Sequence, residues 1–220
     1  MIEYLNNLDM QALLAVNANH GAIADAFMMA YSGKLIWGAM YLSLLWFLWK
    51  RQGLTSAVLV LFAIVTTIAI VDQTCATLLR PVFERLRPSH NAEIGSLVHV
   101  VNGYRGGLYG FPSCHAANSV ALTMWFFMLC GPRSRLTQML IVWCLLTCYS
   151  RMYLGVHYPG DLLFGAVVGT LSALLCWFVT MRLFKVGNFR GNTATAIPVG
   201  VFLITVIAIL IYAIAGHFLG

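Results

Sequence analysis

Long apolar runs, separated by short polar or charged segments, make up most of the chain from Leu35 onward. A run of about 20 apolar residues can cross the hydrocarbon core of a bilayer as an α-helix. Six runs come near that length: Leu35–Trp49, Leu54–Leu79, His115–Cys130, Leu136–Ser150, Asp161–Phe184 and Ala196–Leu219. The pattern therefore predicts an all-α fold, a polytopic membrane helical bundle with about six transmembrane helices.

The first 30 residues follow a different pattern, in which apolar positions recur at near-helical spacing among polar ones. The apolar positions are Ile2, Leu5, Leu8, Leu13 and Val16. A helix with one apolar and one polar face is suited to the membrane interface, so we expect an N-terminal interfacial helix. The segment has no basic start and carries Glu3 and Asp9, so a cleaved signal peptide is not expected.

The composition is that of a membrane protein. Hydrophobic residues make up 60% of the chain and charged residues only 9%, against roughly 25% charged residues in soluble domains. We therefore interpret residues 1–220 as a single membrane-embedded domain. The net charge of +6 does not indicate a nucleic-acid partner, because the basic residues are scattered between the runs. No obligate protein partner is evident, and the six cysteines show neither a disulfide framework nor a zinc-binding spacing.

The charged residues are distributed unequally between the two sets of connections. The connections after the first, third and fifth runs hold seven basic residues and no acidic one: Lys50, Arg51, Arg133, Arg135, Arg182, Lys185 and Arg190. The other face holds the remaining six basic residues and all seven acidic ones. By the positive-inside rule the first face is cytoplasmic. We expect a multi-pass protein of a bacterial inner membrane, with both termini facing the periplasm or exterior.

Polar residues gather at the ends of the runs on that outer face: Arg80, His115, Ser150, Arg151 and Asp161. Before the third run, Pro112 and Ser113 offer a first-turn proline and a capping hydroxyl, and a helix N-terminus binds anions through its free N–H groups. Arg80, Arg87 and Arg151 can make bidentate contacts to phosphate oxygens. These residues together indicate a site for a multiply charged oxyanion.

His157 and Asp161 are separated by Tyr158-Pro159-Gly160, which makes one continuous helix through both unfavourable. We expect a turn that folds the carboxylate back onto the imidazole. A carboxylate bonded to one ring nitrogen fixes the tautomer and leaves the other nitrogen free to attack phosphorus. His115 would then be the general acid that protonates the leaving oxygen.

Three short motifs carry these residues. They are Arg80 with six residues before Arg87-Pro88, then Pro112-Ser113-Cys114-His115, and then Ser150-Arg151 with five residues before His157 and three more before Asp161. In order and spacing they resemble the signature of the type 2 phosphatidic acid phosphatase superfamily of integral-membrane lipid phosphatases: Lys-x6-Arg-Pro, Pro-Ser-Gly-His and Ser-Arg-x5-His-x3-Asp. Here Arg80 replaces the usual lysine, and Cys114 replaces the usual glycine.

The resemblance implies hydrolysis of a membrane lipid phosphate with neither metal nor cofactor. His157 would be the nucleophile that forms a phosphohistidine, with Asp161 as its partner and His115 as the acid. The phosphoryl oxygens would be held by Arg80, Arg87, Arg151, Ser113 and the Cys114 amide. The candidate substrates are phosphatidic acid, phosphatidylglycerol phosphate, undecaprenyl diphosphate and the phosphates of lipid A.

Other interpretations of the same residues stay open at this point. The enzyme could pass the phosphoryl group to a second lipid, or the site could belong to a transporter or a non-catalytic binder, although the runs contain almost no central charge. A metal site of His115, His157 and Asp161 is disfavoured because guanidinium groups nearby oppose a cation. Structural or solvent-exposed roles are expected for the remaining candidates: His20, His90, His99, His217, Asp72 and Arg85.

Overall fold

The computed structural model describes residues 2–184 and 194–219 of the chain, so Lys185 and Arg190 of the charge argument lie outside the described residues. Within this part, all named elements are helical, and one isolated bridge joins Leu86 to Tyr109. The elements are α1 (Ile2–Asn17), α2 (Ala22–Tyr31), η1 (Leu35–Trp37), α3 (Gly38–Asp72), the π-helical segment η2 (Gln73–Leu79), α4 (Arg80–Phe83), η3 (Pro88–His90), η4 (Val101–Gly103), α5 (Cys114–Cys130), α6 (Arg135–Tyr153), α7 (Pro159–Leu183) and α8 (Ala196–Leu219). The predicted all-α class is confirmed.

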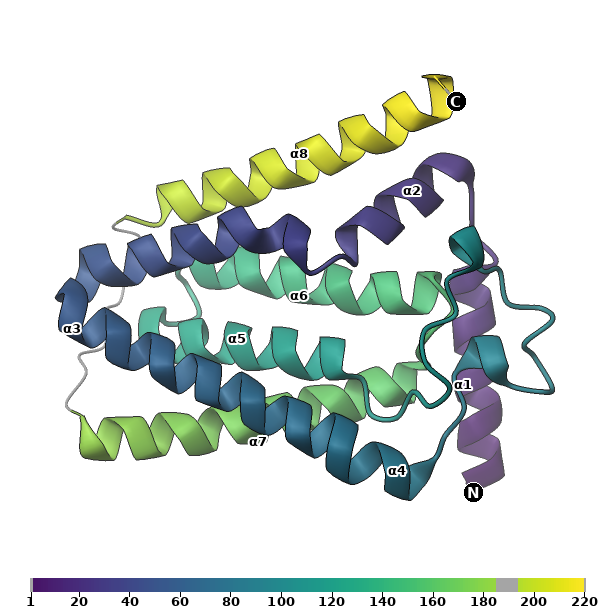
Figure 1. The fold of residues 1–220 in the computed structure, drawn as a ribbon, viewed down its shortest axis with the longest axis horizontal. Coiled ribbons are helices and arrows are strands. Elements are labelled where there is room, and N and C mark those ends of the chain that lie inside the picture. The colour runs from purple at the N-terminus through teal and green to yellow at the C-terminus, as the bar shows by residue number, and fades with distance from the viewer. Residues whose placement is uncertain (1, 185–193, 220) are drawn as a thin grey trace.

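Helix α3 contains the boundary that the sequence predicted between the first two apolar runs. Gly53 interrupts it with φ 76° and ψ 171°, a backbone conformation that glycine adopts far more readily than other residues. Figure 1 shows the helix turning sharply there and running back along the bundle. Two antiparallel segments, before and after Gly53, therefore stand where the sequence predicted two membrane spans.

Three described helical stretches are long and apolar enough to cross a membrane, namely Leu35–Phe83, Pro159–Leu183 and Ala196–Phe218. The first of them includes the Gly53 break. Helix α5 has only 17 residues, and its large side chains Trp125, Phe126 and Leu129 are fully buried between its neighbours. The chain is thus a membrane protein, whereas the count of about six spans stays a prediction.

The N-terminal segment differs from the single interfacial helix that we expected. Helix α1 ends at Asn17, whose buried amide donates to the carbonyls of His99 and Tyr153 and accepts the N–H of His99. A second helix, α2, starts after Gly21 and packs along α8 and α6. The prediction of one helix is therefore wrong, because these long-range bonds stop α1 one turn before α2 begins. Helix α1 itself lies across the end of the bundle (Figure 1).

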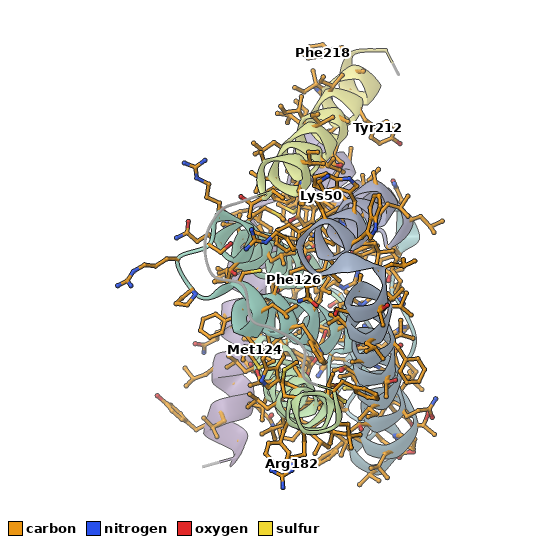
Figure 2. The ribbon with its side chains drawn as sticks, turned by 90° about the vertical axis from the view of Figure 1, so that its left-hand side faces the viewer. Lys50, Met124, Phe126, Arg182, Tyr212 and Phe218 are labelled. Carbon is orange, nitrogen blue, oxygen red and sulfur yellow. The ribbon has the colours of Figure 1, made fainter. Side chains whose placement is uncertain are left out.

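The polar ends of the helices meet at one end of the bundle. Figure 1 places α1, α4, the start of α5, the end of α6 and the start of α7 together at this end. Figure 2 looks onto the opposite end and shows Lys50 and Arg182 there. The bundle thus separates the basic connections from the motif residues, as the sequence predicted.

Close packing between α5 and α7 sets the position of this end. A Cβ atom on Gly169 would collide with the carbonyl oxygen of Ala117, and one on Gly165 would come within 2.5 Å of the Ser113 carbonyl oxygen. The two helices can approach this closely only because α7 carries no side chain at these points. Gly200 in α8, by contrast, has open space around the same position.

Replacing Gly169 by alanine should therefore destabilise the protein, because α5 and α7 must move apart to admit the methyl group, at a cost of about 1–3 kcal/mol. Gly200→Ala is the matched control. It should leave stability unchanged or slightly raise it, since alanine favours a helix by about 0.5–1 kcal/mol over glycine. Thermal unfolding of the detergent-solubilised protein checks both, and equal melting temperatures for the two variants would contradict the packing argument.

Candidate active site

The loop from Glu84 to Ser113 folds over the polar end of the bundle and is held there by backbone hydrogen bonds. The Arg87 N–H donates to the Leu108 carbonyl, and the Ser89 N–H donates to the Gly155 carbonyl, at 3.0 and 3.2 Å. Glycines in this loop make room for the site. A Cβ on Gly110 would lie 3.0 Å from Arg87 Cγ and 3.3 Å from Asp161 Oδ2. The absence of a side chain at Gly110 therefore lets the loop backbone approach the motif residues closely.

His157 lies in the turn between α6 and α7 and is only 1% exposed. Arg87 Nη1 is 3.0 Å from His157 Nε2 and donates to the Val156 carbonyl at 2.9 Å. A guanidinium cannot accept a hydrogen bond, so Nε2 must carry the lone pair. In the neutral ring the proton is then on Nδ1, which faces Asp161 Oδ2 at 3.4 Å. The geometry thus sets the tautomer that a nucleophilic Nε2 requires.

Asp161 occupies the first turn of α7, which begins at Pro159, two residues before the start that the sequence predicted. Its Oδ2 accepts the Tyr158 N–H at 3.0 Å, which caps the helix. Its Oδ1 accepts Arg85 Nη1 at 2.8 Å, and the side chain is fully buried. The carboxylate therefore folds back toward the imidazole while the Tyr158 N–H and Arg85 hold it.

Arg85 is not the solvated loop charge that we expected from the sequence. Besides Asp161, it bonds Asp9 Oδ2 through Nη2 at 2.7 Å, and its guanidinium lies 4.3 Å from the centre of the Tyr158 ring. Asp9 Oδ1 also accepts the Gly160 N–H at 2.7 Å. Burial disfavours the charged guanidinium, but Asp161 and Asp9 outweigh it and raise the pKa of Arg85. A chain of bonds thus links α1 to the carboxylate beside His157, and no local sequence signal marks it.

The start of α5 forms a second wall of the site. Ser113 is the N-cap, and its hydroxyl accepts the Ala116 N–H at 3.4 Å. Pro112 precedes the cap, so the prediction of a first-turn proline is wrong; Cys114 takes that place because Ser113 caps the helix. Arg80 Nη2 donates to the Pro112 carbonyl and to Cys114 Sγ, both at 3.2 Å. The cysteine side chain therefore contacts the arginine that replaces the usual lysine.

Arg151 completes a group of three arginines around His157, hereafter the arginine cluster (Arg80, Arg87 and Arg151). It is 2% exposed and donates to the Tyr104 hydroxyl at 3.0 Å and to the Ser32 hydroxyl. Among the residues that the structure describes, no ion pair involves the cluster, and the three Nε atoms are buried without a hydrogen-bond partner. The cluster thus has both charge and donors to offer an anion.

The electrostatics of the site follow from this unpaired charge. Burial, and then the charges of the arginine cluster, lower the pKa of His157 well below its usual value. Burial and the other two guanidiniums lower the pKa of Arg87 to about 10. Both shifts oppose further positive charge, so the site favours a neutral imidazole together with a bound oxyanion.

The remaining candidates lie outside this cluster or at its edge. His115 is the second residue of α5, directly after Cys114, and lines a cavity beside the site. Asp72 accepts Asn118 Nδ2 at 2.8 Å. His99 pairs with Asp25 at 2.8 Å and stacks on His20, away from the arginines. In residues 2–184 and 194–219, no three His, Cys, Asp or Glu side chains are grouped so that they could hold a metal ion.

Comparisons with known proteins agree with the motifs and the fold. The sequence matches the PAP2 superfamily over residues 56–185. It is 41% identical to a lipid A 4'-phosphatase of Bacteroides thetaiotaomicron, covering 97% of this chain and 99% of that protein. A lipid A 4'-phosphatase of Porphyromonas gingivalis is 30% identical, over 91% of this chain and 84% of that one.

The fold is also that of a solved structure. The crystal structure of Aquifex aeolicus LpxE superposes with a TM-score of 0.57, covering 78% of this chain and 95% of that chain at 21% identity. The three motifs, the helical fold and the relatives lead to the same family. The chain belongs to the PAP2 superfamily, the type 2 phosphatidic acid phosphatases that its motifs resemble, and it is a membrane lipid phosphatase.

Proposed function

We propose that the protein removes a phosphate group from lipid A through a phosphohistidine at His157. The observation that carries the mechanism is the buried His157 Nε2, which bears its lone pair 3.0 Å from Arg87 Nη1, within the arginine cluster. The substrate rests on the 41% identical relative, a lipid A 4'-phosphatase that this chain matches over nearly the full length of both. Phosphatidic acid, phosphatidylglycerol phosphate and undecaprenyl diphosphate are the competing substrates.

In the first step Nε2 attacks phosphorus, the N–P bond forms, and the P–O bond to the lipid breaks with its electron pair on oxygen. Arg87 moves from Nε2 to a phosphoryl oxygen, where the arginine cluster, the Ser113 hydroxyl and the Cys114 amide hold the developing charge. Asp161 faces Nδ1–H and stabilises the imidazolium that forms. His115 gives its proton to the leaving oxygen.

In the second step water attacks the phosphohistidine. His115, now without its proton, takes one from the water as the O–P bond forms. The N–P bond breaks, its electrons return to Nε2, and inorganic phosphate leaves. Both histidines are then in their starting forms, so the cycle needs no other reactant than water.

The site would face the extracytoplasmic side of a bacterial inner membrane. The support is the charge asymmetry of the sequence, because basic residues such as Lys50 and Arg182 lie at the opposite end of the bundle (Figure 2). A lipid phosphate in that leaflet places its head group at the level of the arginine cluster while its chains stay in the hydrocarbon layer.

The central experiment measures phosphate release by the purified protein from lipid A and the three competing lipids. Lipid A should be the preferred substrate, and wild type incubated with labelled lipid A should carry acid-labile label. His157→Gln should lose activity on the order of 1,000-fold or more and carry no label, while the exposed His217→Gln serves as control. Full activity of His157→Gln would contradict the mechanism, and label appearing in a second lipid would indicate phosphotransfer instead of hydrolysis.

Arg85→Gln should lower kcat by roughly 100-fold with little change in KM, because Asp161 loses the charged partner that holds it beside His157. The matched control is Arg133→Gln, an exposed arginine in the loop between α5 and α6. Steady-state kinetics on lipid A check the prediction. An Arg85→Gln variant with wild-type kcat would show that Tyr158 alone positions the carboxylate.

Acidification should destabilise the wild type more than His157→Gln. The lowered pKa of folded His157 comes first from burial and then from the arginine cluster, whereas the unfolded chain takes up this proton near the usual value of about 6.5. Below a pH of about 6.5 the unfolded state therefore binds more protons than the folded state, so the protein loses stability as the pH falls further. Melting temperatures in phosphate-free detergent from about pH 8 to about pH 5 test it; equal pH slopes would contradict it.

A further inference from the structure

A cavity of about 450 Å³ opens beside the active site between α3, α5 and α6. His115 and Cys114 line one end of it, and His157 and Arg87 do not line it. Away from His115 its walls are mainly apolar, formed by residues such as Leu44, Leu48 and Phe126, with Tyr41, Trp143 and Thr147 among them. The cavity therefore runs from the proton donor into the apolar interior of the bundle.

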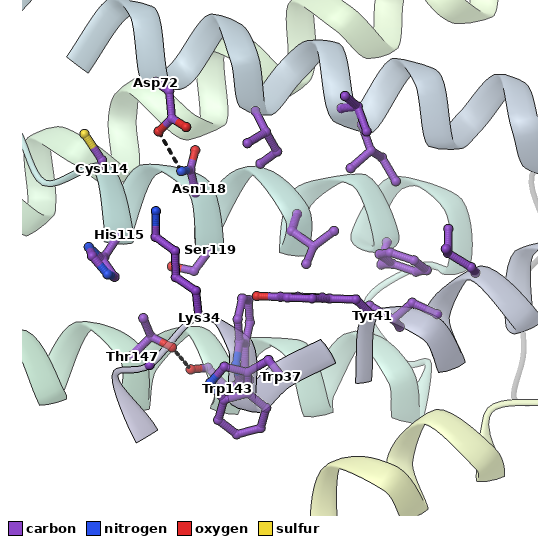
Figure 3. A pocket seen from close by; sticks show the side chains of 18 of the residues that line it. Lys34, Trp37, Tyr41, Asp72, Cys114, His115, Asn118, Ser119, Trp143 and Thr147 are labelled. Atoms are coloured by element: carbon purple, nitrogen blue, oxygen red, sulfur yellow. Dashed lines mark hydrogen bonds between the residues drawn. The ribbon is translucent and has the colours of Figure 1, made fainter. Parts of the chain in front are cut away.

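The end of the cavity near His115 is polar, and we refer to Lys34, Asp72 and Asn118 as the polar band (Figure 3). Asn118 Nδ2 donates to Asp72 Oδ1 at 2.8 Å, and this bond fixes the orientation of the amide. The other amide atom, Oδ1, is then a buried acceptor without a hydrogen-bond partner among the described residues. Lys34 reaches into the cavity between His115 and Asn118 (Figure 3).

The chemistry of phosphoryl transfer decides what occupies this cavity. The attacking nitrogen and the leaving oxygen lie on opposite sides of phosphorus, so the lipid alcohol must leave on the side away from His157. In the proposed mechanism His115 gives its proton to that leaving oxygen, and His115 lines the cavity. If the proposed mechanism holds, the part of the substrate that bears the phosphate therefore lies against the polar band.

We propose that the polar band is a subsite for polar groups of the leaving lipid, with an N–H or O–H donor on Asn118 Oδ1 and an acceptor on Lys34. Such a subsite selects phosphates carried by an amide- or hydroxyl-bearing scaffold, for example an N-acylated amino sugar. The diacylglycerol of phosphatidic acid has only ester linkages and offers acceptors only, and polyprenyl chains offer neither. The inference rests on the proposed function and extends it from a phosphate to the alcohol that carries the phosphate.

A donor to Asn118 Oδ1 is the partner that the described residues do not supply. A site built to hydrogen-bond a substrate rejects an analogue without that group, because its own polar atom then stays unpaired. Asp72 carries a negative charge and the free atom of Asn118 is an acceptor. Both disfavour a second phosphate at this place, although Lys34 is positive. A neutral amide or hydroxyl thus fits the polar band better than an anion does.

Two lipid phosphates with equal chain lengths test the subsite. Ceramide 1-phosphate carries amide and hydroxyl donors, whereas phosphatidic acid carries only ester acceptors, and both are phosphate monoesters of primary alcohols. The wild type should favour ceramide 1-phosphate in kcat/KM by about 10-fold or more. Asn118→Leu should remove most of this preference by lowering activity on ceramide 1-phosphate alone. Lys34→Met should lower activity on both lipids, because both offer acceptors, and should leave the preference unchanged.

Leu145→Met, on the exposed face of α6, is the control and should keep the wild-type preference. Equal loss on both lipids in Asn118→Leu would mean that Asn118 only braces Asp72, and the proposal would then be wrong. An unchanged preference would overturn it as well. If the wild type does not hydrolyse lipid A, the proposed substrate is wrong. The comparison of ceramide 1-phosphate with phosphatidic acid still tests the subsite, because neither lipid is lipid A.

Discussion

Positive charge without a counter-ion in the protein is the constraint on which the site depends. Asp161 and Asp9 are bonded to Arg85, and within the described residues no ion pair joins a carboxylate to the arginine cluster. The cluster is neutralised when an oxyanion binds. Burial and then the same charge lower the pKa of His157, so under the proposed mechanism one electrostatic condition would both attract the phosphate and keep the imidazole ready to attack.

The bundle sustains this charge by fixing the groups around it. The glycine-mediated contact of α5 with α7 brings the Ser113 N–H to 3.0 Å from the Asp161 carbonyl, which joins the starts of the two helices. The loop over the site adds Arg87, and α1 adds Asp9. Backbone contacts therefore set the positions of side chains that would otherwise repel one another. The stability of the whole fold offsets the free energy of this repulsion.

The sequence predicted those parts of the molecule that depend on local pattern. Apolar runs marked the long helices, the charged pair Lys50-Arg51 separated the two runs that form the halves of α3, and Tyr158-Pro159-Gly160 marked a break before Asp161, because each pattern acts within its own segment. Contacts between distant segments could not be predicted from these local patterns. Asn17 ends α1 through bonds to residues 82 and 136 positions away, and Arg85 meets Asp9 76 positions away, so hydropathy could assign neither role.

The bond between Arg87 and His157 Nε2 has a consequence for an enzyme that lives among phospholipids. A ligand must take Arg87 from the imidazole before the nitrogen can attack. The attraction of the three guanidiniums grows with the charge on the phosphate, and a terminal phosphate carries up to two charges where a phosphodiester carries one. Under the proposed mechanism, the phosphodiesters that make up the bulk of a bilayer would therefore compete poorly for Arg87, and the enzyme would leave the surrounding phospholipids intact.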